Sequence, residues 1–146
     1  MDYKVLITTS GTGSRLGELS KNKNKVLVDI NGQAAINYLI DSHPKEASFV
    51  ITLGYLGEQV KDYLLKNYPD RHFEFAVVDK YEGSGSSLGY SLLCAKDLLQ
   101  CPFIFQACDT IVTEKIPAPD KNWIAGFMVD KAVSYTHLRA HETKAN

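Results

Sequence analysis

Neither sign of charge predominates in this chain. Its 146 residues carry 16 basic and 17 acidic side chains, a formal net charge of −1 at pH 7. This balance provides no surface-wide field for nucleic acid or for an anionic membrane, so a polyanion could be held only by a few positioned cations. We therefore expect a small anionic ligand, and neither nucleic acid nor a membrane as partner.

Long apolar runs are also missing. No stretch approaches the roughly 18 residues that a membrane-spanning helix needs. Met1 to Lys4 leads directly into a predicted strand, without the pattern of a signal peptide. These absences predict a cytoplasmic protein. The hydrophobic share of 45% is enough for the core of one globular domain and leaves the oligomeric state open.

Cysteine and histidine show no metal-binding pattern. Cys94, Cys101 and Cys108 are odd in number and lack the C-x-x-C spacing of zinc sites. We expect buried free thiols rather than a metal or redox centre. His43 and His72 look like surface positions.

The last residues differ in character from the rest. From about Val133 to Thr143 the sequence resembles the translation of a widely used transposase sequencing adapter. We therefore expect one native domain over residues 1–132 and a non-native tail over residues 133–146. A natural polar tail is the alternative.

Between the two ends, short β-branched runs alternate with helical patterns, which predicts parallel βαβ units. The predicted strands are 3–9, 49–53, 73–78, 102–107 and 123–129. The predicted helices are 36–42, 57–67 and 86–99. We expect an α/β fold, a Rossmann-like doubly wound and mostly parallel sheet with helices on both faces. Ligands should bind at the carboxyl ends of its strands.

A two-glycine turn follows the first predicted strand. Gly11 and Gly13 can take positive φ and approach a ligand closely, so that several backbone N–H groups converge on one anion. Arg15 and Lys25, a little further on, supply the positive charge that amides lack. The pattern predicts a phosphate site, with a plain turn beside solvated cations as the alternative.

Two familiar nucleotide-binding loops do not fit this turn. A dinucleotide loop would need a third glycine at Leu16 and a crossover helix before the acidic Asp29, but residues 18–24 have no apolar periodicity. A Walker loop would need a G-K-[ST] sequence, which does not follow. An NAD(P)-binding oxidoreductase stays open as another class of function, as does a non-catalytic nucleotide-binding domain.

Taken together, the motifs resemble those of nucleotidyltransferases of the sugar-nucleotide pyrophosphorylase type, in the nucleotide-diphospho-sugar transferase superfamily. That family opens with L-I-x-A-A-G-x-G-x-R-L, followed by P-K-x-L, a hydrophobic-N-G-x-P turn and G-Y-x-x-E-Q-[IV]. Later it has a segment that holds the base and a strand that ends in G-D. The corresponding residues here are 6–16, 24–27, 30–33, 54–60, 83–88 and 103–109.

Several positions depart from the family pattern. Thr9 and Ser10 replace two alanines, Asn24 replaces the proline before the lysine, Ala34 replaces a second proline, and Cys108 replaces the glycine before the aspartate. None of these changes removes a charged group. They indicate a divergent branch, whose base and acceptor cannot be taken over from better-known members.

The resemblance implies a role for each matched residue. Arg15 would hold the β- and γ-phosphates, Lys25 would lie at the α-phosphate, and Asp109 would bind Mg²⁺ as the cofactor. The expected nucleotide contacts are Ser10, Gly11, Thr12, Gly13, Gly54, Tyr55, Gly83, Ser84, Gly85 and Ser86. Ordinary turn chemistry, or a helix cap for the aspartate, is the alternative.

The activity implied is transfer of a nucleotidyl group from an NTP to a phosphorylated small molecule, with release of pyrophosphate. A sugar 1-phosphate is the first expected acceptor, and cytidylyl transfer to phosphocholine or a similar head group is the alternative. Family members place a second acidic metal ligand and much of the acceptor pocket further along their chains. Residues 1–132 would therefore be the N-terminal, nucleotide-binding part of a fold that is incomplete at its C-terminus, and this chain alone would not be fully active.

Overall fold

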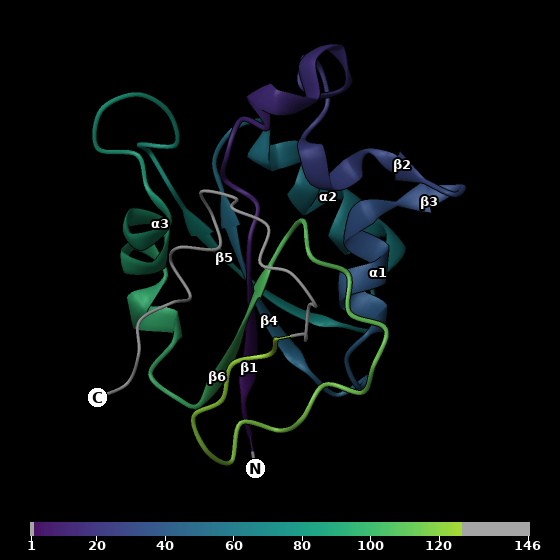
Figure 1. The fold of residues 1–146 in the computed structure, drawn as a ribbon, viewed down its shortest axis with the longest axis vertical. Helices are drawn as coiled ribbons and strands as arrows, with labels where there is room; N and C mark the ends of the chain where they lie inside the picture. Colours follow the sequence, from purple (N-terminus) through teal and green to yellow (C-terminus); the bar gives the residue numbers. More distant parts are fainter. Residues whose placement is uncertain (1, 127–146) are drawn as a thin grey trace, which may run out of the picture.

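Four parallel strands form the central sheet of the computed structural model, which describes residues 2–126 (Figure 1). The strands are β1 (Lys4–Thr8), β4 (Ser48–Leu53), β5 (His72–Val77) and β6 (Phe103–Ala107), in the order β5-β4-β1-β6. The chain runs outward from β1 to β5 and then crosses back to place β6 on the other side of β1. The carboxyl ends of β1 and β6 therefore flank the point where the strand order reverses, which is where such sheets bind ligands.

Short elements connect these strands. The α-helices are α1 (Ala35–Asp41), α2 (Gly57–Asn67) and α3 (Leu88–Cys94). The 3₁₀ turns are η1 (Ser14–Ser20), η2 (Lys25–Leu27) and η3 (Lys96–Leu98), and β2 (Asp29–Ile30) pairs with β3 (Gln33–Ala34) in a small hairpin. No helix among residues 2–126 is long and apolar enough to cross a membrane.

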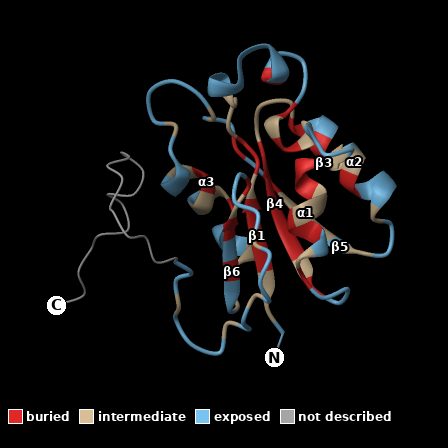
Figure 2. Cartoon of the chain, turned by 45° about the vertical axis from the view of Figure 1, so that its right-hand side comes forward, coloured by how far each residue is buried: buried red, intermediate tan, exposed pale blue. Residues whose placement is uncertain are grey.

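Alternate residues of β1 and β4 enter two separate cores, because successive side chains of a strand point to opposite faces. On one face, Val5, Ile7, Phe49 and Ile51 pack with residues of α1 and α2. On the other, Leu6, Val50 and Ala76 pack with Ala95 and with the partly buried Leu92 of α3. Figure 2 shows β1 and β4 largely buried and β6, which has one neighbour in this sheet, alternating between exposed and buried. The predicted doubly wound parallel sheet is confirmed.

The predicted helix over residues 86–99 is too long. Ser87 accepts a hydrogen bond from the backbone N–H of Tyr90 at 3.0 Å, so the helix begins only after this cap. Its last residue is Cys94, and its first residue, Leu88, is 52% exposed. The predicted strand 123–129 is not formed over residues 123–126. Its remainder, like the expected tail 133–146, lies outside the described residues.

The three cysteines are free thiols. Cys108 is buried, whereas Cys94 and Cys101 are half-buried. The expectation of buried free thiols is therefore confirmed for Cys108 and wrong for the other two.

His43 is buried, so its expected place at the surface is wrong. Its Nε2 lies 2.7 Å from Oε1 of Gln106 on β6, and its ring meets that of Phe49 edge to face. Burial is the main cause that lowers the pKa of His43 below the usual 6.5; the Gln106 hydrogen bond opposes this shift, and the charge of Arg71 adds to it.

This burial predicts that stability falls in mild acid. Because the pKa is lower in the folded state, the unfolded chain binds the proton first, and the free energy of unfolding decreases as pH falls below about 6.5. One proton accounts for at most about 1.4 kcal/mol per pH unit. Urea unfolding at several pH values should show a shallower pH dependence for His43→Gln than for the exposed control His72→Gln. Equal slopes would contradict the assignment.

Candidate functional site

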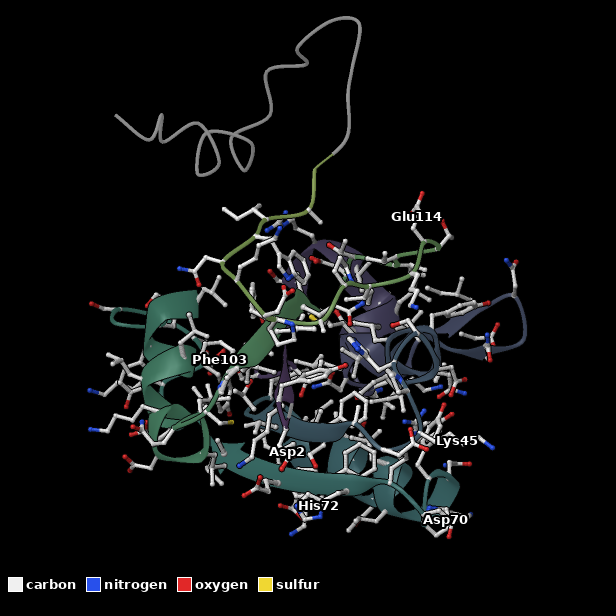
Figure 3. The ribbon with its side chains drawn as sticks, turned by 90° about the horizontal axis from the view of Figure 1, so that it is seen from below. Asp2, Lys45, Asp70, His72, Phe103 and Glu114 are labelled. Carbon is white, nitrogen blue, oxygen red and sulfur yellow. The ribbon has the colours of Figure 1, made fainter. Side chains whose placement is uncertain are left out.

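The residues singled out in the sequence lie in loops after the carboxyl ends of the strands. These loops follow β1, β4, β5 and β6 and lie toward the upper end of the sheet in Figure 1. Figure 3 views the molecule from below and labels Asp2, His72 and Phe103, which lie at the amino ends of β1, β5 and β6. The sheet topology thus gathers the candidate residues at one edge, away from these three.

The turn after β1 is tied to the end of β4. The hydroxyl of Thr9 donates to the carbonyl of Thr52 at 2.6 Å, and both residues are fully buried. Gly13 has the expected positive φ of 64°. Gly11 does not, and the expectation for it is wrong, but a Cβ there would meet nothing within 4 Å. The backbone at Gly11 therefore borders open space.

Gly54 allows the turn after β4 to pass directly against the β1 loop. The backbone N–H of Tyr55 donates to the carbonyl of Ser10 at 2.9 Å. An ideal Cβ on Gly54 would lie 2.5 Å from the same carbonyl oxygen and 2.9 Å from Cβ of Tyr81. Because a side chain would not fit between them, glycine is required at this position by packing. Any contact of Gly54 with a nucleotide stays a prediction.

Lys25 and Asp109 meet at the reversal point of the sheet. Lys25 Nζ lies 3.9 Å from Asp109 Oδ2, and the side chains are 24% and 74% exposed respectively. The stem of Lys25 lies against Gly13, where a Cβ would come within 2.9 Å of Lys25 Cβ. Beneath them, burial raises the pKa of the Cys108 thiol, although the charge of Lys25 acts in the opposite direction. The structure thus brings together the predicted phosphate-binding lysine and metal-binding aspartate.

A hollow of about 380 Å³ lies beside the β1 loop. It is lined by Thr12, Ser14, Gly17, Glu18, Ser20, Lys21, Tyr55 and Glu82. Of the predicted site residues, Thr12 and Tyr55 contribute to this lining. Arg15 is exposed in η1 and does not line it.

The predicted base-holding turn, residues 83–86, is exposed at 83–85 and half-buried at Ser86, and it does not line the hollow. Gly83 and Gly85 take positive φ, and Ser86 donates to the carbonyl of Gly83 through both its backbone N–H and its hydroxyl, whereas Ser84 is exposed. The hollow is bordered instead by Glu82, the residue just before the turn.

The loop after β5 contacts α3 through the side chain of Tyr90. The hydroxyl of Tyr90 donates to Asp79 at 2.5 Å, and Lys80 lies over the Tyr90 ring. This hydrogen bond raises the pKa of Tyr90 to about 12 and lowers that of Asp79. The contact anchors the loop at one end and leaves residues 83–85 exposed.

Asp109 is the residue that fits a divalent cation at this edge. Residues 2–126 contain no group of three or more His, Cys, Asp or Glu side chains that could hold a metal ion by themselves. Mg²⁺ needs no such cage, because it is commonly bound through one or two carboxylates together with substrate phosphates and water. The exposed carboxylate of Asp109 fits that kind of site.

Asn24 and Gln59 were not identified from the sequence as site residues. Asn24 is fully buried, and its backbone N–H donates to Oε1 of Gln59 at 3.2 Å. Its side chain accepts from the N–H of Val26 at 3.1 Å and caps η2, which begins with Lys25. The one signal in the sequence was an asparagine directly before a short turn, the usual place for a side-chain cap.

The structure is that of an α/β protein of the doubly wound, nucleotide-binding class. The features that define this class are the strand order, the turn after β1, and the lysine beside an aspartate at the reversal point. No protein-family model matches the chain. Two curated proteins are similar to the chain in amino-acid sequence. Choline-phosphate cytidylyltransferase of Streptococcus pneumoniae is 32% identical over 106 residues, 71% of this chain. CTP:phosphoglutamine cytidylyltransferase of Campylobacter jejuni is 31% identical over 100 residues, 66% of this chain.

Solved structures agree with this relationship. The CTP:phosphocholine cytidylyltransferase of Streptococcus pneumoniae has a TM-score of 0.63 at 28% identity and covers 84% of this chain. A UDP-glucose pyrophosphorylase has a TM-score of 0.65 at 20% identity, which shows the shared fold. The chain belongs to the nucleotidyltransferase family that contains these pyrophosphorylase-type enzymes. It spans 44% and 38% of the two curated relatives and about half of each structure.

Proposed function

We propose that the protein transfers a nucleotidyl group from an NTP to a phosphorylated small molecule and releases pyrophosphate. The observation that carries this proposal is that Lys25 lies beside Asp109 and Gly13 at the reversal point of the sheet. The relatives of the chain are nucleotidyltransferases. A reaction between two anions depends on charge neutralisation and on in-line positioning. A half-buried lysine at the edge of a glycine turn suits that task.

In the proposed reaction an oxygen of the acceptor phosphate attacks the α-phosphorus of the NTP. The bond from that phosphorus to the oxygen bridging toward the β-phosphate breaks, and pyrophosphate leaves. Lys25 neutralises the charge that builds on the α-phosphate, and its fixed position costs no reorganisation during the reaction. Arg15 and the N–H groups of residues 10–13 hold the departing phosphates, with the guanidinium able to donate two parallel hydrogen bonds to phosphate oxygens.

Asp109 would hold Mg²⁺ through its carboxylate group. When bound, the ion supplies further positive charge to the phosphates. The carboxylate lies 3.9 Å from the ammonium group of Lys25. This proximity supports a shared role of Asp109 and Lys25 at one group of phosphates.

CTP is the first donor to test and phosphocholine the first acceptor. Two curated relatives at 31% and 32% identity are named as cytidylyltransferases, and one of them acts on choline phosphate. This reverses the order expected from the sequence, where a sugar 1-phosphate came first. Glucose 1-phosphate therefore remains in the panel as the second acceptor.

The test is pyrophosphate release by the protein extended to the length of its curated relatives, of which this chain spans 44% and 38%. The panel combines CTP, UTP, GTP and ATP with phosphocholine or glucose 1-phosphate. We expect one donor and acceptor pair to release pyrophosphate in the presence of Mg²⁺, and CTP to bind in calorimetry. Nucleotide binding without release from any pair would contradict the transferase and favour a non-catalytic nucleotide-binding domain. A change in NADH fluorescence on binding would favour the oxidoreductase alternative.

Asp109→Ala should abolish the effect of Mg²⁺ on CTP binding. Without metal, the variant should bind CTP at least as tightly as the unaltered protein, because the substitution removes a negative charge 3.9 Å from Lys25 Nζ. Calorimetric titrations with Mg²⁺ and with EDTA measure both quantities. The exposed Asp97, in η3, provides the control substitution Asp97→Ala. A Mg²⁺ effect that survives in Asp109→Ala would exclude this aspartate as the metal ligand.

A further inference from the structure

Three loops of the site converge on the side chain of Asn24. Its Nδ2 donates to the carbonyl of Thr9 at 3.0 Å and to the carbonyl of Tyr55 at 2.6 Å, while Oδ1 accepts from the N–H of Val26. Both donor hydrogens and the acceptor of the amide are therefore used, inside a residue with no exposed surface. The ends of β1 and β4 and the start of η2 are joined through this one group.

The segment before Lys25 is also fastened to the start of α2. The hydroxyl of Tyr55 donates to the carbonyl of Lys21 at 2.7 Å. Gln59 donates through Nε2 to the carbonyl of Asn22 at 3.1 Å and accepts from the N–H of Asn24. Residues 21–24 are thus held at several points, although they form no regular element that would fix them.

The residue after Lys25 is held as firmly as the residue before it. Val26 is 1% exposed and belongs to the core beneath α1 and α2. With Asn24 hydrogen-bonded on one side and Val26 packed on the other, the backbone of Lys25 is fixed. Its side chain then runs past Gly13 toward Asp109.

We propose that Asn24 is a positioning residue that sets the place of the Lys25 ammonium group against the bound phosphates. This inference rests on the proposed function, because it assumes that Lys25 contacts phosphate. Proline, which the resembling family has at this position, provides neither a side-chain amide nor a backbone N–H. Aspartate would keep the cap on η2 but would place a carboxylate against two carbonyl oxygens. Asparagine can make all the side-chain and backbone hydrogen bonds found at this position.

A double-mutant cycle with Lys25 tests the positioning role. The variants are Asn24→Ser, Lys25→Gln and the two together, and the quantity measured is the dissociation constant of CTP in excess Mg²⁺ by calorimetry. Serine retains an oxygen that can cap η2 but cannot supply both amide donors. We expect Asn24→Ser to weaken CTP binding about tenfold when Lys25 is present and less than about twofold in the Lys25→Gln background, because the two residues act as a unit.

The outcomes separate the two proposals. The same loss in both backgrounds would mean that Asn24 only supports the fold, and the positioning role would be wrong while the proposed function stands. If Lys25→Gln alone does not weaken CTP binding, Lys25 does not contact the phosphates. The proposed mechanism and the role of Asn24 would then both be wrong. Asn67→Ser is the control, since Asn67 is exposed and donates to the carbonyl of Tyr63 at 2.8 Å on α2; it should not change CTP binding.

A second variant covers the case in which Asn24→Ser does not fold. Gln59→Ala removes the contacts of an exposed side chain with Asn22 and Asn24 and leaves the Asn24 side chain intact. We expect it to weaken CTP binding about threefold, again only when Lys25 is present. If Gln59→Ala weakens CTP binding equally with and without Lys25, this result alone would contradict the positioning role of Asn24.

Discussion

Lys25→Gln lowers turnover at least about tenfold, the scale of one lost contact to the transition state. The ammonium group is held 3.9 Å from Asp109 at the reversal point of the sheet, and no other lysine among residues 2–126 forms an ion pair with this aspartate. Glutamine keeps part of the stem that packs against Gly13 and removes only the charge. The measurement is the rate of pyrophosphate release, with the melting temperature as a check on folding.

The neighbouring Lys23 supplies the matched control for this prediction. It is exposed on the same loop, so Lys23→Gln removes the same charge outside the proposed site. We expect Lys23→Gln to change turnover by less than about twofold, as for a weak, screened surface charge. Equal losses for the two variants would indicate a general electrostatic effect rather than a specific contact of Lys25.

Gly54→Ala lowers the free energy of unfolding by about 3 kcal/mol, near the upper end of the usual cost of overpacking. The new Cβ would lie 2.5 Å from the carbonyl oxygen of Ser10, which is backbone and accepts the hydrogen bond from Tyr55 N–H. Either that hydrogen bond or the place of the β1 loop must change. Urea unfolding measures the loss.

Gly11→Ala is the matched control for Gly54→Ala. A Cβ on Gly11 would meet nothing within 4 Å, and Gly11 does not have positive φ. We expect the melting temperature of Gly11→Ala to stay close to that of the unaltered protein, while CTP binding weakens because the methyl group occupies space proposed for phosphate. A destabilisation equal to that of Gly54→Ala would contradict the difference in packing between the two glycines.

The elements with strong local patterns could be predicted from the sequence. Helix α2 has the predicted bounds 57–67, because Val60 and Leu64 recur at helical spacing and are both fully buried. The four strands of the sheet were predicted to within one or two residues from their β-branched runs. The alternation of these elements predicted the parallel sheet. It also predicted the edge of the sheet at which Lys25 and Asp109 meet.

The parts that depend on distant contacts could not be predicted in this way. The burial of His43 depends on Gln106, 63 residues further along the chain. The role of Asn24 depends on carbonyl groups of Thr9 and Tyr55, which reach it only when β1 and β4 are paired. A sequence pattern reports the periodicity of one segment and contains no information about such partners.

The resemblance found in the motifs and the comparisons with known proteins lead to the same family. The motifs surrounding Gly13, Lys25 and Asp109 predicted a nucleotidyltransferase, and this membership is confirmed. The contacts of individual residues with nucleotide and with Mg²⁺ stay predictions. The acceptor likewise has to be determined by experiment, since the relatives differ in the molecules for which they are named.

The central claim is that a nucleoside triphosphate binds at the carboxyl edge of the sheet, between β1 and β6. The most direct test is an NMR titration of the ¹⁵N-labelled chain with CTP and Mg²⁺, following the backbone amide signals. We expect the signals of residues 10–13 and of Lys25 to shift, while those of Asp2, His72 and Phe103 at the opposite edge do not. Shifts confined to the opposite edge, or none at all, would contradict this claim.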